Sequence, residues 1–271
     1  DCKCTYFPSK IQRKSNKKIP LSRLRLTLIW LFIENILPLH SFNLLTGRNS
    51  MFLLTQKIII RQVHIGIAGN IGCGKTTLTE MLAKHYKWEP RYESVVENPY
   101  MDDYYKDIQR WSFAMEVFFL KERFKDVLQI AGSDKTIIQD RTLHEGVFVF
   151  TANNYAQGNM SDRDFETYME LYEMMVEKVK LPDLMIYLRA SVPHLVENIQ
   201  KRGRECEQKI PIEYLRGLND RYEDFIRNKY KGKVLIVDVD NLDYKNKPED
   251  FRSITDKIDS ILFGLFDLNE K

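Results

Sequence analysis

Residues 69–77 read GNIGCGKTT, and the spacing of their glycines, lysine and hydroxyl side chains suits a chain of phosphates. Four of them match the pattern G-x-x-x-x-G-K-[ST]: Gly69, Gly74, Lys75 and Thr76. Glycines let backbone N–H groups approach phosphate oxygens. The lysine reaches the β- and γ-phosphates, and the threonine hydroxyl is a ligand for Mg²⁺. The sequence therefore predicts nucleoside triphosphate binding, with contacts from Gly69, Asn70, Ile71, Gly72, Cys73, Gly74, Lys75, Thr76 and Thr77.

A second chemical motif is the pair Asp140 and Arg141, which ends the apolar stretch TIIQDRT. A carboxylate in this position can hold Mg²⁺, and the adjacent arginine can hold a phosphate in transfer. The alternative is an ion pair in the loop between a strand and a helix. The sequence lacks the N-K-x-D and D-x-x-G patterns of GTPases, so a kinase is favoured over a GTPase switch.

The segments that must position these motifs alternate between two periodicities. Five short apolar stretches predict strands, at residues 63–68, 88–95, 136–139, 184–188 and 234–239. Segments with apolar residues at spacings of three and four predict helices, at residues 78–86, 111–132, 162–180, 192–201, 212–229 and 248–266. Strands alternating with helices predict an α/β fold with a parallel sheet covered on both faces.

Ordered motifs between residues 63 and 266 resemble those of the deoxyribonucleoside kinase family, which includes deoxycytidine, deoxyguanosine and deoxyadenosine kinases. The matching stretches are GNIGCGKTT, YESVVENPY, YYKDIQRWSF, QDRT, PDLMIYLRAS, KRGRECEQKIPIEYL and VLIVDVDNLD. The resemblance implies a P-loop kinase fold with a five-stranded parallel sheet flanked by helices. It also implies transfer of the γ-phosphoryl group of ATP, with Mg²⁺, to the 5′-hydroxyl of a deoxyribonucleoside in nucleotide salvage.

The resemblance assigns roles to the catalytic residues. Glu93 matches the family's general base, and the reaction needs an acceptor for the hydroxyl proton. Arg141 would contact the 5′-oxygen and the phosphate, and Lys75 the phosphates. Asp140, where many members have Glu, would bind Mg²⁺ together with Thr76.

Further matches concern the sugar and the phosphates of ATP. Tyr105 and Glu207 would bind the sugar 3′-hydroxyl, a contact that distinguishes a nucleoside kinase from a nucleoside monophosphate kinase. The stretch KRGREC resembles an arginine-bearing lid, although a basic helix end near its dipole remains an alternative. The expected ATP contacts outside the phosphate loop are Arg202, Arg204, Asp238 and Asp240.

The base pocket departs from the family pattern. Glu116 stands where members usually have a glutamine, and Arg123 matches the family's arginine on the base side. Gly146 falls where several members carry an Asp paired with that arginine. Glu116 could read two adjacent donors of guanine, could form an ion pair with Arg123, or could carry a shifted pKa and act like the amide that it replaces. Phe113 and Phe148 are candidate stacking walls or core residues.

The first 57 residues differ in character from the rest. Residues 1–50 carry nine Lys or Arg and two acidic residues, a balance of +7, whereas the remaining 32 basic and 36 acidic residues give −4. The apolar run at residues 26–39 is shorter than the about 20 residues that span a bilayer. We expect residues 1–57 to be an extension and residues 58–271 to be the kinase domain, with Met51 as a candidate start.

The charge and the cysteine content limit the binding partners and the cellular compartment that we expect. The mildly acidic body argues against nucleic-acid binding, and the four cysteines show no C-x-x-C pairing, which fits the reducing cytosol. We therefore expect a cytoplasmic enzyme that needs no membrane and, as is common in the family, a homodimer. The rival hypotheses are a nucleoside monophosphate kinase and a non-catalytic nucleotide-binding protein tethered by its basic head.

Overall fold

The computed structural model describes residues 62–93, 98–204, 207–208 and 210–264. The expected extension at residues 1–57 lies outside these residues, and so does its boundary with the domain. None of the helices within the described ranges has the length and apolar character needed to cross a membrane.

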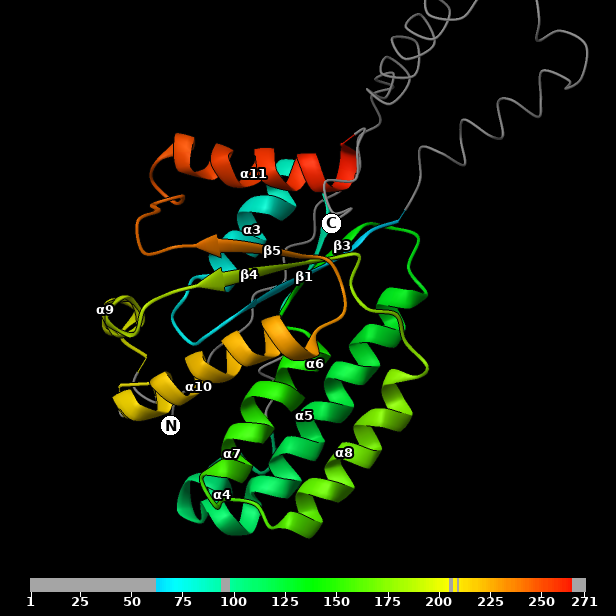
Figure 1. Ribbon diagram of the computed structural model, residues 1–271, viewed down its shortest axis with the longest axis vertical. Coiled ribbons are helices and arrows are strands. Elements are labelled where there is room, and N and C mark those ends of the chain that lie inside the picture. The colour runs from blue at the N-terminus through cyan, green and yellow to red at the C-terminus, as the bar shows by residue number, and fades with distance from the viewer. Residues whose placement is uncertain (1–61, 94–97, 205–206, 209, 265–271) are drawn as a thin grey trace, which may run out of the picture. The chain divides into compact units, whose positions relative to one another are not determined.

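A parallel sheet forms the centre of the described fold (Figure 1). Its order β2-β3-β1-β4-β5 and the parallel pairing of every neighbouring pair confirm the predicted five-stranded sheet. In the register, Ile65 of the central strand lies opposite Ile138 on one side and Leu184 on the other. The strands are β1 (His64–Gly69), β2 (Glu89–Arg91), β3 (Ile137–Asp140), β4 (Leu184–Arg189) and β5 (Val234–Asp238).

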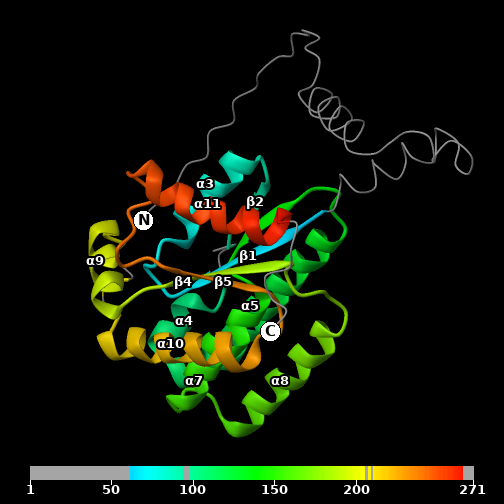
Figure 2. The ribbon, with the colours of Figure 1, turned by 45° about the horizontal axis from the view of Figure 1, so that its top comes forward.

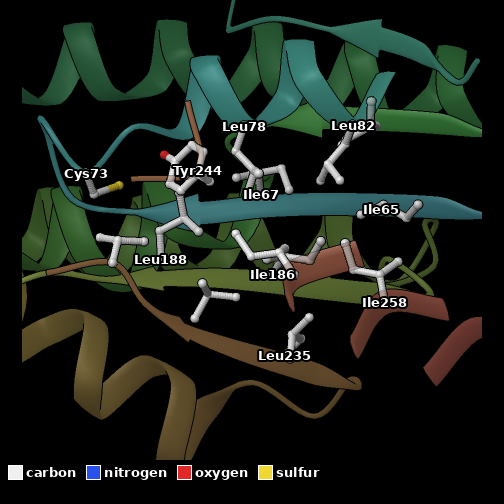
Figure 3. Packing of buried hydrophobic residues seen from close by; sticks show 14 of the residues in the cluster. Ile65, Ile67, Cys73, Leu78, Leu82, Ile186, Leu188, Leu235, Tyr244 and Ile258 are labelled. Carbon is white, nitrogen blue, oxygen red and sulfur yellow. The ribbon is translucent and has the colours of Figure 1, made fainter. Parts of the chain in front are cut away.

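Two helices, α3 (Lys75–Tyr86) and α11 (Pro248–Phe263), cover one face of the sheet (Figures 1 and 2). Alternate strand residues point toward them, as Figure 3 shows for the cluster around β1 and β4. The buried contacts join Ile65, Ile67, Ile186 and Leu188 with Leu78, Leu82 and Ile258. Burial on both faces explains why these strands read as continuous apolar runs.

The opposite face is covered by α10 (Ile212–Asp224) and the π-helical turns η1 (Gly146–Thr151) and η2 (Phe225–Lys229). Their side chains pack against Ala68, Met185 and Tyr187, the strand residues that point away from α3. Beyond them, α5 (Ile108–Ala131) and α8 (Asp162–Val176) pack together through a separate buried cluster. The remaining helices are α4 (Met101–Lys106), α6 (Leu143–Glu145), α7 (Ala152–Ala156) and α9 (Val192–Arg202).

Several boundaries differ from those expected. The helix expected at 111–132 begins at Ile108, because Asp107 caps it by accepting a hydrogen bond from the Arg110 N–H at 3.0 Å. Of the strand expected at 88–95, β2 covers Glu89–Arg91, where it pairs with β3, and residues 94–95 lie outside the described part. The helix expected at 248–266 ends at Phe263, and residues 265–266 lie outside the described part.

Candidate active site

Parallel strands carry their carboxyl ends to one edge of a sheet, where open α/β sheets bind ligands. The phosphate loop follows β1, Asp140 ends β3 and is followed by Arg141, and Asp238 ends β5. Residues from distant parts of the sequence therefore meet at this edge of the sheet.

The phosphate loop has the backbone that its glycines allow. Gly72 and Gly74 adopt φ angles of +86° and +94°, and a Cβ on Gly72 would lie 2.8 Å from the Leu195 carbonyl oxygen. Lys75 opens α3 and donates from Nζ to the Asn70 carbonyl oxygen at 2.9 Å, inside the loop. Burial raises the pKa of the Cys73 thiol, which keeps this side chain an uncharged part of the core.

Side chains that the sequence analysis did not identify hold this loop in place. Asn219 on α10 accepts from Asn70 Nδ2 at 2.6 Å and donates to the Ala190 carbonyl at 2.8 Å. Asn198 on α9 donates to the Gly72 carbonyl at 2.9 Å, and the Tyr244 hydroxyl donates to that of Gly74 at 3.2 Å. These contacts join residues that are far apart in the sequence, so no local sequence pattern predicts them.

A cleft of about 810 Å³ opens beside the loop. It is bordered by α9 and by the segment after β5, which includes Asp240 and Tyr244. Asp240 also accepts the Ser191 N–H at 2.9 Å. Asp238 lies outside the lining of the cleft, and its exposed carboxylate pairs with Arg189 Nε at 2.7 Å. Thr77 and Arg202, two of the residues predicted to contact ATP, contribute to the lining.

Thr76 and Asp140, the expected metal ligands, lie side by side. The Thr76 hydroxyl donates to Asp140 Oδ2 at 2.6 Å. The other oxygen, Oδ1, is buried and has no hydrogen-bond partner among the described residues. A hydroxyl and a carboxylate with a spare oxygen are the hard ligands that Mg²⁺ prefers, so this pair fits the ion.

Glu93 lies between Arg123 and Arg141. The family resemblance assigns Arg123 to the base side of the acceptor and Arg141 to its 5′-oxygen. Its Oε1 accepts from Arg123 Nη2 at 2.9 Å, and its Oε2 lies 3.2 Å from Arg141 Nε. Burial would raise the pKa of this carboxyl, but Arg141, Arg123 and Lys75 together lower it to about 2. Arg141 itself has a φ of +69°, unusual for a residue with a side chain, and its guanidinium lies 4.2 Å from the Phe150 ring centre.

Glu116 is a buried carboxylate on α5. It accepts hydrogen bonds from Thr151 Oγ1 at 3.0 Å and from Asn154 Nδ2 at 2.8 Å. Burial raises the pKa of Glu116 against the opposing effect of Arg123. The expected alternative, an ion pair between Glu116 and Arg123, is not formed, because the guanidinium is turned to Glu93. Gly146 packs against Arg123 so closely that a Cβ there would collide with Nη1.

The other expected contacts divide into three groups. Glu207 accepts hydrogen bonds from Arg202 and, at 3.3 Å, from Arg204, so it lies with the lid arginines. Phe113 and Phe148 both pack against the buried cluster between α5 and α8, and Phe148 stacks on Phe225. Tyr105 belongs to α4, and its side chain lies outside what the structure describes.

Glu145 is a buried polar residue that the sequence analysis missed. Its carboxylate accepts from the Thr142 N–H at 2.8 Å, from the Tyr222 hydroxyl at 2.9 Å and from the Gly69 N–H at 3.3 Å. It thereby joins the start of the phosphate loop, the turn after β3 and α10. The spacing T-x-x-E at residues 142–145 is a capping-box signature that could have revealed it.

The sheet order, the phosphate loop and the carboxylate–arginine cluster together define a P-loop kinase. The family model of deoxynucleoside kinases matches residues 65–263, and the chain belongs to that family. It is therefore an enzyme that phosphorylates deoxynucleosides.

Named relatives agree with this assignment. A deoxyadenosine/deoxycytidine kinase of Bacillus subtilis is 34% identical over 200 residues, which cover 73% of this chain and 92% of that protein. A deoxyguanosine kinase of the same organism is 32% identical over 73% of this chain and 97% of its own length. The structure of a deoxyadenosine kinase from M. mycoides with bound dATP is 37% identical, with a TM-score of 0.64, covering 73% of this chain and 100% of that one.

Proposed function

We propose that this chain transfers the γ-phosphoryl group of ATP to the 5′-hydroxyl of a deoxyribonucleoside, with Glu93 as the general base. The observation that carries the proposal is the position of Glu93. Its Oε2 lies 3.2 Å from Arg141 Nε, and the residue borders the same cavity as Asp140 and Arg141. The solved structures of the M. mycoides deoxyadenosine kinase with dATP, dCTP and the product dCMP support a site for deoxynucleotides.

The reaction asks little covalent chemistry of the protein. The nucleoside O5′ attacks the γ-phosphorus, the bond from that phosphorus to the β–γ bridging oxygen breaks, and the hydroxyl proton passes to Glu93. Lys75 and Arg141 neutralise charge on the phosphoryl group as it moves. Thr76 and Asp140 would hold Mg²⁺, which when bound neutralises the β- and γ-phosphates. ADP and a deoxynucleoside monophosphate are the products.

The acceptor is bound on the opposite side of Glu93 from the phosphate loop. Glu116 and Arg123 face the base, Phe113 forms part of the wall, and Tyr105 and Glu207 bind the 3′-hydroxyl. Glu207 pairs with Arg202 and Arg204, so a sugar contact through Glu207 would lie beside the arginines proposed to hold the phosphates of ATP. On the donor side, the lid arginines hold the phosphates while the segment of Asp238 and Asp240 borders the adenine.

The test is a coupled ADP-release assay with ATP and Mg²⁺ over the four deoxynucleosides and their 5′-monophosphates. Phosphorylation of a deoxynucleoside, with no turnover of the monophosphates, supports the proposal. Turnover of monophosphates alone supports a nucleoside monophosphate kinase. ATP binding without any turnover supports the non-catalytic alternative, in which the head at residues 1–57 acts as a tether.

The enzyme is also proposed to be a cytoplasmic homodimer whose kinase domain spans residues 58–271 and binds no nucleic acid. The outer surfaces of the paired helices α5 and α8 carry the exposed apolar side chains Leu128 and Met174. Such residues suit a helix–helix interface between two copies. Sedimentation equilibrium measures the assembly: a mass of one chain at micromolar concentration would contradict the dimer.

A further inference from the structure

Glu93 and its two arginine partners lie in a closely packed part of the structure. Together with Tyr92, Phe119 and neighbouring residues, Glu93 and the arginines border a cavity of only about 10 Å³. That volume is about one water-sized sphere. A group larger than water therefore fits this cavity only after side chains have moved.

Arg141 is the more firmly anchored of the two arginines. Its backbone N–H donates to the Ile67 carbonyl at 3.0 Å, which fixes it to β1, and its guanidinium lies over Phe150. It also faces the phosphoryl group in the proposed reaction, so its contact with Glu93 belongs to the catalytic arrangement.

Arg123 has unused hydrogen-bonding capacity. One N–H group, on Nη2, bonds to Glu93, whereas Nε is buried without a hydrogen-bond partner among the described residues. Because residue 146 is glycine, Nη1 occupies the space that a side chain at this position would take. A buried donor without a partner is costly, so Arg123 gains from an added acceptor. A carbonyl oxygen or ring nitrogen of a nucleobase is such an acceptor.

We propose that Arg123 is a positioning residue that holds Glu93 in the free enzyme and passes to the nucleobase when a deoxynucleoside binds. The exchange leaves Oε1 of Glu93 free for the 5′-hydroxyl. Recognition of the base at one end of the acceptor thereby releases the general base at the other end. The inference rests on the proposed function, because it needs the base to lie beside Arg123.

The exchange changes the basicity of Glu93. The charged groups that face its carboxylate are Arg123 on α5, Arg141 after β3 and Lys75 of the phosphate loop. Glu122, Asp126 and Asp140 border the same cavity, as does the phenol of Tyr92. Loss of Arg123 moves the Glu93 pKa up from about 2. A general base works better as its pKa approaches the working pH, so the exchange favours proton transfer.

Proton-linked binding tests this exchange without ATP or Mg²⁺. Calorimetric titration of the full chain with deoxyguanosine or deoxyadenosine, in two buffers of different ionisation enthalpy, measures protons taken up per nucleoside bound. A carboxyl whose pKa rises to the ordinary glutamate range takes up about 0.2 proton at about pH 5 and almost none at about pH 7. Glu93→Gln removes this uptake because the titrating group is gone.

Two variants separate the exchange from a merely structural role of Arg123. Arg123→Met removes the guanidinium, so the Glu93 pKa is already raised before binding and the uptake is lost. Gly146→Asp gives Arg123 a competing carboxylate, which should release Glu93 in the free enzyme and also reduce the uptake. Lys121→Met is the matched control, since it removes one positive charge from the same helix, where Lys121 pairs with Glu122.

The outcomes are distinct. Uptake in the parent and the control, and its loss in either variant, supports the exchange. A parent that phosphorylates deoxynucleosides but takes up no proton, or variants that retain the uptake, overturns the exchange and leaves the proposed function standing. A parent that neither binds nor phosphorylates a deoxynucleoside overturns both.

Discussion

At the scale of single residues, Glu93 carries the strongest prediction. Glu93→Gln keeps the size of the side chain and its contact with Arg123, but the amide cannot take a proton from the 5′-hydroxyl. We expect turnover to fall by about 10² or more, the size of a general-base contribution. Affinity for ATP, measured by equilibrium titration, should change little, because Glu93 lies outside the lining of the cleft beside the phosphate loop.

The control is Glu170→Gln on the exposed side of α8, which should have the turnover of the parent. Turnover of Glu93→Gln within a factor of about two of the parent would remove Glu93 from its role as base, since even a modest general base contributes more.

Glu116 gives the second prediction at this scale. An ionised carboxylate only accepts hydrogen bonds, and guanine offers two adjacent donors, N1–H and the N2 amino group, on its pairing edge. Arg123 would supply the donor for O6. A hydrogen bond to a charged group contributes about 1.5–3 kcal/mol, so we expect kcat/KM to favour deoxyguanosine by about 10- to 100-fold. Glu116→Gln should reduce that preference.

The contacts of Glu116 bear directly on this prediction. Both carboxylate oxygens already accept one hydrogen bond, from Thr151 and from Asn154. Each oxygen keeps a second lone pair for the base. The measurement is kcat/KM for deoxyguanosine, deoxyadenosine, deoxycytidine and thymidine in the parent and in Glu116→Gln. A parent that does not favour deoxyguanosine, or an unchanged ranking in the variant, would show that Glu116 does not read the base.

At the scale of elements, the buried side chain of His144 joins the turn that follows β3 to helix α8. His144 Nδ1 lies 2.8 Å from the Tyr172 hydroxyl, and the ring packs edge-on against Tyr172 and Tyr230. Burial, with a smaller contribution from His64, lowers the His144 pKa to about 4. In the unfolded chain this histidine has the ordinary pKa of about 6.5. As the pH falls, the unfolded chain therefore binds a proton there before the native state does.

The sign of the pH dependence follows from this difference. The stabilisation from neutral His144 is fully present above about pH 6.5 and is lost as the pH falls from there toward 4, where the native state also binds the proton. Over that window His144 lowers the free energy of unfolding by about 1.4 kcal/mol per pH unit. We expect His144→Gln to be less stable at about pH 7 but to show a shallower decline between about pH 6.5 and 5.

Urea unfolding at several pH values measures this slope. His85→Gln is the matched control, because His85 lies on the exposed part of α3 and should leave the slope unchanged. Equal slopes in the parent and His144→Gln would show that His144 does not account for the loss of stability in acid.

The elements that sequence reasoning missed share a physical cause. The residues of η1 form a continuous apolar run that is buried on most sides, so they show no 3.6-residue periodicity. The short helices α4, α6 and α7 are held by tertiary contacts rather than by their own amphipathic pattern. By contrast, the long helices and the strands β1, β3, β4 and β5 were predictable, because periodicity and caps are local properties.

The same division applies to the active site. The phosphate loop and the pair Asp140–Arg141 were predictable because each is a contiguous motif beside a strand. The pairing of Arg123 with Glu93 was not, because it depends on which of two carboxylates from different segments the guanidinium meets. Gly146 alone did not reveal it, since an absent side chain shows its effect only through the neighbours that occupy its space.

At the scale of the whole molecule, the question is whether the first 50 residues contribute to the folded enzyme. The family match covers residues 65–263 and so leaves these residues out. We therefore expect a chain that starts at Met51 to unfold in one cooperative transition, with the urea midpoint and the kcat/KM of the full chain. Loss of cooperativity or of activity would show that the head is structural.

Because residues 1–50 carry a balance of +7, co-sedimentation with anionic vesicles is the second measurement. Equal recovery of both chains in the supernatant agrees with an extension that does not tether the enzyme, whereas pelleting of the full chain alone would favour the tether.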